Sequence, residues 1–135
     1  MAGGEGEAGG VLRVAGGEGR LRVEALAVLV GGDLVVAIWG GTAPHVGAVA
    51  LAQPRPSLDD PRVTSSTSSV LTLLGHKDDV VAREAADRLA AASGRTAVVT
   101  AGLHVDDATV ADRQALVANA RACVGQLLRL LGAER

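Results

Sequence analysis

The stretch RLRVEALAVLVGGDLVVAIWGG, residues 20–41, decides the fold of this chain. Within residues 20–30 the apolar side chains recur at every second position, which is the period of a half-buried β-strand. The Gly-Gly-Asp step at 31–33 is a tight-turn signal, since glycine supplies the positive φ that hairpin loops need. Residues 34–39, LVVAIW, form a second apolar run. The stretch therefore predicts a β-hairpin.

Further strands are expected on both sides of this hairpin. Residues 11–15, VLRVA, precede it across the glycine-rich turn at 16–19. After Gly40 and Gly41 interrupt the third run, residues 45–52, HVGAVALA, indicate a fourth strand. Strands joined by such short connections most simply form an antiparallel meander.

The second half of the chain predicts helices as well as strands. Residues 53–62 contain three prolines, which lack the N–H that a sheet ladder requires, so we expect a loop there. The elements expected after the Ser/Thr run at 64–69 are a strand at 70–74, a helix from GHKDD (75–79) to Gly94, a strand at 96–102 and a helix from LHVDDAT (103–109) to Gly132. The fold class is therefore α+β, with a mostly antiparallel β-sheet or sandwich of about six strands and two helices.

Composition favours a single soluble domain. We expect a disordered tail at 1–10 and one α+β cofactor-binding domain at 11–135. The net charge of −2, with both signs interspersed, gives no footprint for nucleic acid or an anionic membrane. A single cysteine excludes an intramolecular disulfide, and the start of the chain lacks the pattern of a signal peptide. We therefore expect a cytoplasmic protein.

Three histidines stand at junctions between expected elements, where side chains from distant segments can converge. They are His45, His76 and His104, and carboxylates such as Asp78 and Asp106 accompany two of them. Three imidazoles with a nearby carboxylate can hold a divalent transition metal. The alternative is that they are turn and cap histidines with no shared role, because their spacing matches no local metal motif.

A second group of residues suits an anion such as a phosphate monoester. Arg55 lies in a rigid Pro-Arg-Pro frame, and Lys77 precedes a helix whose first N–H groups attract negative charge. The hydroxyls at 65–69 and the backbone at Gly40 and Gly41 add further donors. The alternative reading of the Ser/Thr run is one face of a polar edge strand.

Trp39 is the only aromatic residue of the Phe, Tyr and Trp types. It can supply a flat wall for a planar ring, or it can close one end of the core. Cys123 lies near the apolar side of the second helix, which favours a small core residue over a nucleophile. No nucleophile elbow and no P-loop is present, so no catalytic residue is assigned.

Four segments together resemble a known family. They are GGDLVVAIWGG, PHVGAVALAQPRPS, SSTSSVLTLLGHKDD and VVTAGLHVDD. They resemble the small prenylated flavin chaperones, the D subunit associated with gallate-type decarboxylases, which are also labelled relatives of a proteasome assembly chaperone. The resemblance covers roughly residues 20 to 130.

This resemblance implies a homodimer that binds prenylated flavin mononucleotide (prenylated FMN, or FMN). It implies delivery of that cofactor to a UbiD-type decarboxylase, or help in its maturation, with a flavin prenyltransferase as a further partner. We expect the phosphate and the ring of the flavin to contact two different groups of residues. The cofactor-binding residues are Arg55, Ser57, Ser66, Ser68 and Lys77 for the phosphate, and Trp39, Gly40, Gly41, His45 and His76 for the ring, with His104 close by.

Two alternatives to a cofactor chaperone stay open. An enzyme acting on the prenylated flavin, by metal-assisted or histidine-assisted oxidation, would contain stoichiometric metal and would depend on His45, His76 or His104. A pure assembly chaperone would lack a small-molecule site and expose an apolar patch. We favour the cofactor chaperone over a stand-alone enzyme. The pure assembly chaperone is the weakest alternative, because a role in protein assembly does not require histidine at three separate turns.

Overall fold

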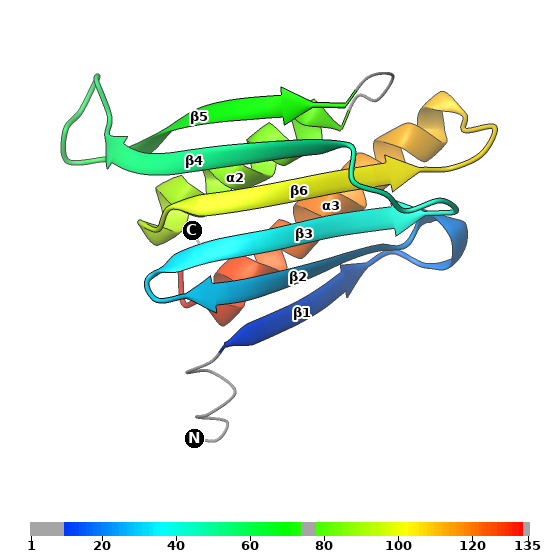
Figure 1. Cartoon of the computed structure of the whole chain (residues 1–135), viewed down its shortest axis with the longest axis horizontal. Coiled ribbons are helices and arrows are strands. Elements are labelled where there is room, and N and C mark those ends of the chain that lie inside the picture. Colours follow the sequence, from blue (N-terminus) through cyan, green and yellow to red (C-terminus); the bar gives the residue numbers. More distant parts are fainter. Residues whose placement is uncertain (1–9, 74–77, 134–135) are drawn as a thin grey trace.

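The computed structural model describes residues 10–73 and 78–133, which form one six-stranded sheet with two helices against one face (Figure 1). The elements are β1 (Val11–Gly16), the 3-10 turn η1 (Gly19–Leu21), β2 (Val23–Val30), β3 (Asp33–Gly41), β4 (Ala48–Pro56), β5 (Thr64–Thr72), α2 (Asp79–Ser93), β6 (Ala97–His104) and α3 (Val110–Leu130). The predicted α+β class is confirmed, in its single-sheet form. Within the described residues no helix is long and apolar enough to cross a membrane.

The strand order is β1-β2-β3-β6-β4-β5. The hairpin of β2 and β3 forms as predicted, and β1 pairs antiparallel with β2. The four-strand meander is wrong at its last member, because β6 lies between β3 and β4, parallel to β3 and antiparallel to β4. The alternation of apolar and polar residues along a strand shows which face of that strand is buried. It gives no information about which other strand lies beside it.

Two of the three prolines that we expected in a loop, Pro54 and Pro56, belong to β4. This strand runs through Pro54, Arg55 and Pro56, all paired with β5. The N–H of Leu73 donates to the carbonyl oxygen of Gly47, and the N–H of Ser57 donates to that of Val63. In an antiparallel pair of strands, hydrogen-bonded and non-hydrogen-bonded residue pairs alternate. Counted from these two bonds, both prolines fall at non-hydrogen-bonded pairs, where no N–H toward β5 is needed. On their other side β6 has already ended, since its first residue pairs with Ala52. The two prolines therefore remove no hydrogen bond from the sheet.

β5 is an edge strand that begins at the Ser/Thr run, earlier than the predicted strand at 70–74. Its side chains alternate between the two faces of the sheet. The hydroxyls of Ser66 and Ser68 donate to the Asp87 carboxylate on α2, at 2.8 and 3.2 Å. These bonds tie the edge strand to the helix that covers it.

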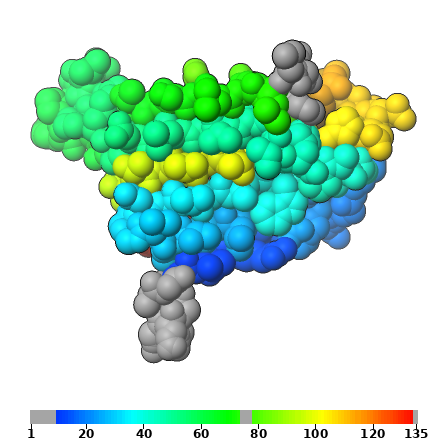
Figure 2. Space-filling model, in the orientation of Figure 1, coloured from blue at the N-terminus to red at the C-terminus, as the bar shows by residue number. Residues whose placement is uncertain are grey.

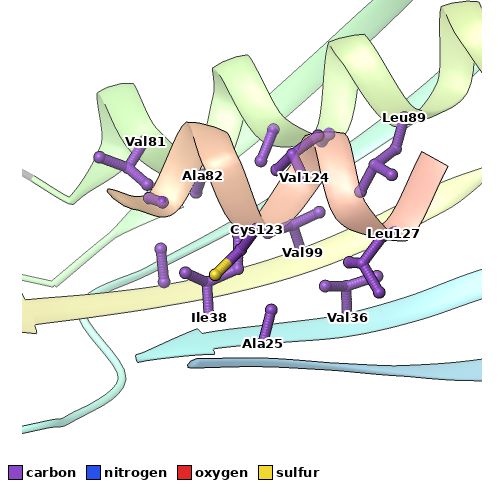
Figure 3. Close-up of a cluster of buried hydrophobic side chains, with 14 of the residues drawn as sticks. Ala25, Val36, Ile38, Val81, Ala82, Leu89, Val99, Cys123, Val124 and Leu127 are labelled. Carbon is purple, nitrogen blue, oxygen red and sulfur yellow. The ribbon is translucent and has the colours of Figure 1, made fainter. Parts of the chain in front are cut away.

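The core lies between the sheet and the helices and is built from small aliphatic side chains (Figure 3). α2 packs over β4, β5 and β6, and α3 packs over β1, β2 and β3. The largest fully buried side chains are Leu34, Ile38, Leu89, Leu127, Leu128, Val23, Val36, Val99 and Cys123. Val110, in the first turn of α3, does not belong to the buried side of the helix, because it is 61% exposed.

Candidate functional site

Two parallel strands end side by side at one edge of the sheet. β3 and β6 are parallel neighbours, in register from Leu34 and Ala97 to Gly41 and His104. The chain leaving β3 crosses the end of β6 to enter β4, whereas the chain leaving β6 turns the opposite way to α3, which covers β1–β3. Ligands in sheets with parallel strands commonly bind where such connections diverge. The ends of β3 and β6 therefore form the candidate ligand site.

Glycines let the crossing turn lie directly on the end of β6. A Cβ atom on Gly102 would collide with the carbonyl oxygen of His45, and one on Gly41 with that of His104. A Cβ on Gly47 would collide with the carboxylate of Asp78. We call these three glycines, with His45, Asp78 and His104, the glycine corner. At Gly41 and Gly102 no side chain fits without moving the backbone, and at Gly47 none fits without displacing the Asp78 carboxylate.

His45 and Asp78 form a hydrogen-bonded pair within the corner. Nε2 of His45 lies 3.0 Å from Oδ2 of Asp78, and Nδ1 lies 3.1 Å from the carbonyl oxygen of Ala43. Oδ1 of Asp78 accepts the backbone N–H of Leu103 at 3.0 Å. Because a carbonyl oxygen only accepts, the contact with Ala43 is made through an Nδ1–H donor, and Nε2 faces the carboxylate of Asp78.

His104 forms a second, more exposed pair. Its Nε2 lies 3.0 Å from Oδ1 of Asp106, and the two side chains are 49% and 77% exposed. The His104 ring meets the His45 ring edge-on, with centroids 6.5 Å apart and planes at 73°. The hydroxyl of Thr42 accepts the backbone N–H of Asp106 at 3.1 Å. The corner therefore contains two histidine–carboxylate pairs, one buried and one open to solvent.

An open hollow of about 290 Å³ adjoins the corner. It is lined by Leu103, His104, Val105, Asp107, Ala108, Arg113 and Leu116. Arg113 donates to the carbonyl oxygen of Ala108 at 3.1 Å, which fixes its guanidinium beside the hollow. Ligand pockets usually measure roughly 300 to 1,000 Å³, so this hollow lies at the lower end of that range.

Trp39 lies on the face of the sheet that no helix covers. We call this surface the open face (Figure 2). Its apolar members include Leu26, Val28, Val35, Trp39, Leu51 and Val98. The guanidinium carbon of Arg13 lies 5.6 Å from the Trp39 ring centroid, and Arg13 also pairs with Glu24 at 2.9 Å. Trp39 is in register with Gly102, which places the indole beside the glycine corner.

The structure separates the residues expected to hold the phosphate. Arg55 is on the open face, where it donates to the hydroxyl of Thr67 at 2.6 Å. It lies at the other end of β4 from Gly47, about 26 Å away at the usual rise of ~3.3 Å per residue. Ser66 and Ser68 point to α2 instead, as described above.

The other residues expected to bind the cofactor make contacts within the protein or lie outside the described residues. The hydroxyl of Ser57 accepts the backbone N–H groups of Asp59 and Asp60 in the loop after β4. His76 and Lys77 lie outside the described residues. Gly40 packs its backbone against Val23, and Gly41 closes on His104, so both serve close approach of the backbone.

The structure brings together His45 and His104 of the three histidines expected to bind metal. Among residues 10–73 and 78–133 no group of three or more His, Cys, Asp or Glu side chains is placed to hold a metal ion. Both ring nitrogens of His45 are engaged in the hydrogen bonds given above. Sequence reasoning placed Asp78 near a histidine without assigning it a role, and it did not identify Arg113. The position of Asp78 directly before a predicted helix was the one feature of the sequence that could have drawn attention to its carboxylate.

Comparison with known proteins agrees with this fold. Residues 17–132 match the prenylated flavin chaperone LpdD-like domain. Protein LpdD of Lactiplantibacillus plantarum is 27% identical over 90 residues, which are 67% of this chain and 62% of that protein. The chain thus spans about three-fifths of this relative's length.

A solved structure with a similar fold is that of a chaperone complex for yeast 20S proteasome assembly. It covers 90% of this chain and 95% of its own, with a TM-score of 0.53 and 17% identity. At that identity the likeness concerns the fold alone. Taken with the match over residues 17–132, the chain belongs to the family of prenylated flavin chaperone LpdD-like domains.

Proposed function

We propose that this protein binds prenylated FMN and delivers it to a UbiD-type decarboxylase, or helps to mature it there. The observation that carries this proposal is the family match, which spans residues 17–132 and so includes the whole glycine corner. A flavin prenyltransferase is the source of the cofactor in this scheme. The protein acts as a carrier, and chemistry on the substrate belongs to the decarboxylase.

The residues at the corner fit part of such a cofactor. Glycine backbone and the Trp39 indole offer flat surfaces to a ring system, and the two histidines offer hydrogen-bond partners to its polar edge. Arg113 supplies a cation beside the hollow. Because the hollow measures about 290 Å³, a whole flavin nucleotide extends beyond it. An open site of this kind also allows the release that a carrier requires.

A homodimer would enclose the rest of the cofactor. The open face presents apolar side chains across neighbouring strands, with Leu51 and Val35 each 43% exposed. Contiguous apolar patches of this kind mark interaction sites, and a two-fold contact would place the patch against its own copy. Trp39 joins this patch to the corner, so the second copy would cover the cofactor from the side that the first leaves open.

The test is co-expression with a flavin prenyltransferase, followed by absorbance and mass spectrometry of the purified protein. We expect a chromophore with the mass of prenylated FMN, and its transfer to an apo UbiD-type decarboxylase on mixing. Because Trp39 is the single fluorophore of its kind in the chain, quenching of its emission measures the affinity directly. A colourless protein whose emission is unchanged by FMN and prenylated FMN would overturn the proposal.

Metal analysis of the same sample tests the enzymatic alternative. Stoichiometric metal together with oxidation of the bound prenylated flavin would favour an enzyme that matures the cofactor. A carrier predicts transfer of the cofactor in the form in which it was loaded.

A further inference from the structure

Asp78 is one of two buried charged residues among those that the structure describes, and the other is Asp112. Asp112 has a local explanation, since it completes the capping box of α3 with Thr109. Asp78 is the N-cap residue of α2, the place that Thr109 takes in α3, yet its side chain makes no cap bond to that helix. Aspartate at this position ordinarily accepts from its own helix. The carboxylate of Asp78 is turned to other segments instead.

Those segments are the two that meet at the glycine corner. Oδ1 accepts the N–H of Leu103 at the end of β6, and Oδ2 pairs with Nε2 of His45 in the turn between β3 and β4. The side chain of Asp78 is 7% exposed and that of His45 is 23% exposed. The backbone of Gly47 closes on both groups, so they have little room to move. Both carboxylate oxygens are therefore occupied away from solvent.

This geometry fixes the orientation of the His45 ring. With Nδ1 held by the carbonyl of Ala43 and Nε2 held by Asp78, a flip of the ring would break both bonds. The ring then lies against the ring of His104, which lines the hollow. A carboxylate that fixes the tautomer and orientation of a functional histidine is a recurrent device in binding sites.

We propose that Asp78 is a positioning residue of the cofactor site, which acts through His45 and does not itself reach the ligand. The inference rests on the proposed function and deepens it, because it assigns a role to a residue that the sequence left without one. Asp78 holds the ring and the crossing turn in the arrangement that receives the flavin. His104 and Asp106, the exposed pair, supply a matched comparison within the same site.

The test compares Asp78→Asn with Asp106→Asn in the full chain. An asparagine keeps the bond from the Leu103 N–H through its oxygen, whereas its NH2 group replaces the carboxylate oxygen opposite Nε2 of His45. The contact between a charged carboxylate and the His45 ring is therefore lost. Affinity for prenylated FMN is measured by quenching of Trp39. We expect Asp78→Asn to weaken binding by about tenfold or more, the loss usual when an orienting carboxylate is removed, and Asp106→Asn to weaken it by less than about threefold.

A spectroscopic measurement separates positioning from a general loss of structure. The chain contains three histidines, so their imidazole signals are readily assigned in 15N-edited NMR spectra. Without ligand, Asp78→Asn should change the Nδ1 and Nε2 signals of His45, and Asp106→Asn should leave them unchanged. Equal affinities of the two variants, or His45 signals that do not respond to Asp78→Asn, would overturn the inference alone. Absence of flavin binding by the unaltered chain would overturn the proposed function and this inference with it.

Gly47→Ala keeps the test decisive if Asp78→Asn fails to fold. The added methyl group would displace the Asp78 carboxylate from His45 while both groups remain in the chain. We expect it to lower the affinity in the same direction, with altered His45 signals. Unchanged affinity despite altered His45 signals would overturn the inference.

Discussion

The carbonyl oxygen of His45 occupies the space where residue 102 would place a side chain. Gly102 is fully enclosed in β6, and the turn between β3 and β4 lies across it. The contact is with backbone, which cannot rotate away as a side chain can. The glycine is therefore required by the crossover of the chain over the end of β6.

Gly102→Ala should be strongly destabilising for this reason. We expect a loss of about 3 kcal/mol or more in the free energy of unfolding, at the upper end of overpacking costs because backbone must shift. Urea unfolding followed by circular dichroism measures it. Gly32→Ala is the control, since a Cβ there meets nothing within 4 Å, and it should change the midpoint little. Similar stability of both variants would contradict the crossover geometry.

Asp112 should make stability depend on pH in the acid range. The backbone N–H of Thr109, followed by the guanidinium of Arg20 at 2.9 Å, holds the pKa of the Asp112 carboxyl below its usual 3.8. A lowered folded-state pKa contributes stability that is present above the unfolded value and lost as the pH falls through the folded value. Asp112→Asn should remove this part of the acid dependence, seen in urea midpoints from pH 7 down to 3. An unchanged profile would count against it.

Cys123 should be inert in the folded protein. Burial raises the pKa of its thiol to about 11, and its Sγ lies 3.5 Å from the carbonyl oxygen of Val23. The thiolate is the reactive form, so modification requires opening of the contact between α3 and the sheet. A disulfide reagent at pH 8 should label the native protein far more slowly than the urea-unfolded chain. Rapid labelling of the native protein would show that α3 detaches readily.

Leu51→Glu should disrupt the proposed homodimer. It places a charge on the open face, where burial of an unpaired carboxylate in the interface is costly. Sedimentation analysis should show a monomer for this variant and a dimer for the unaltered chain. Leu58→Glu is the matched control, because Leu58 is 88% exposed in the loop after β4. If both variants remain dimeric, the dimer uses another surface.

Sequence reasoning succeeded where structure is local. Alternation over residues 20–41 predicted the hairpin of β2 and β3, because Gly31 takes the positive φ that its turn requires. The segment LHVDDAT (103–109) indicated the start of α3, where Thr109 and Asp112 form a capping box. The four quoted segments were sufficient for the family resemblance, which the match over residues 17–132 confirms.

It failed where an outcome depended on a neighbour. Pro54 and Pro56 were excluded from the sheet because the rule against proline assumes that both sides of a strand are paired. The phosphate contact of Ser66 and Ser68 stays a prediction, and their hydroxyls bond to Asp87 on a helix that the sequence cannot place beside β5.

By itself, the sequence determined the α+β class, the hairpin, the helix caps and the family, because each depends on residues close together in the chain or on their order along it. Tertiary structure decided that β6 enters between β3 and β4, and this single placement created the glycine corner. His45, Asp78 and Leu103 come from three separate segments. Their meeting depends on long-range packing of the strands, which no local period encodes.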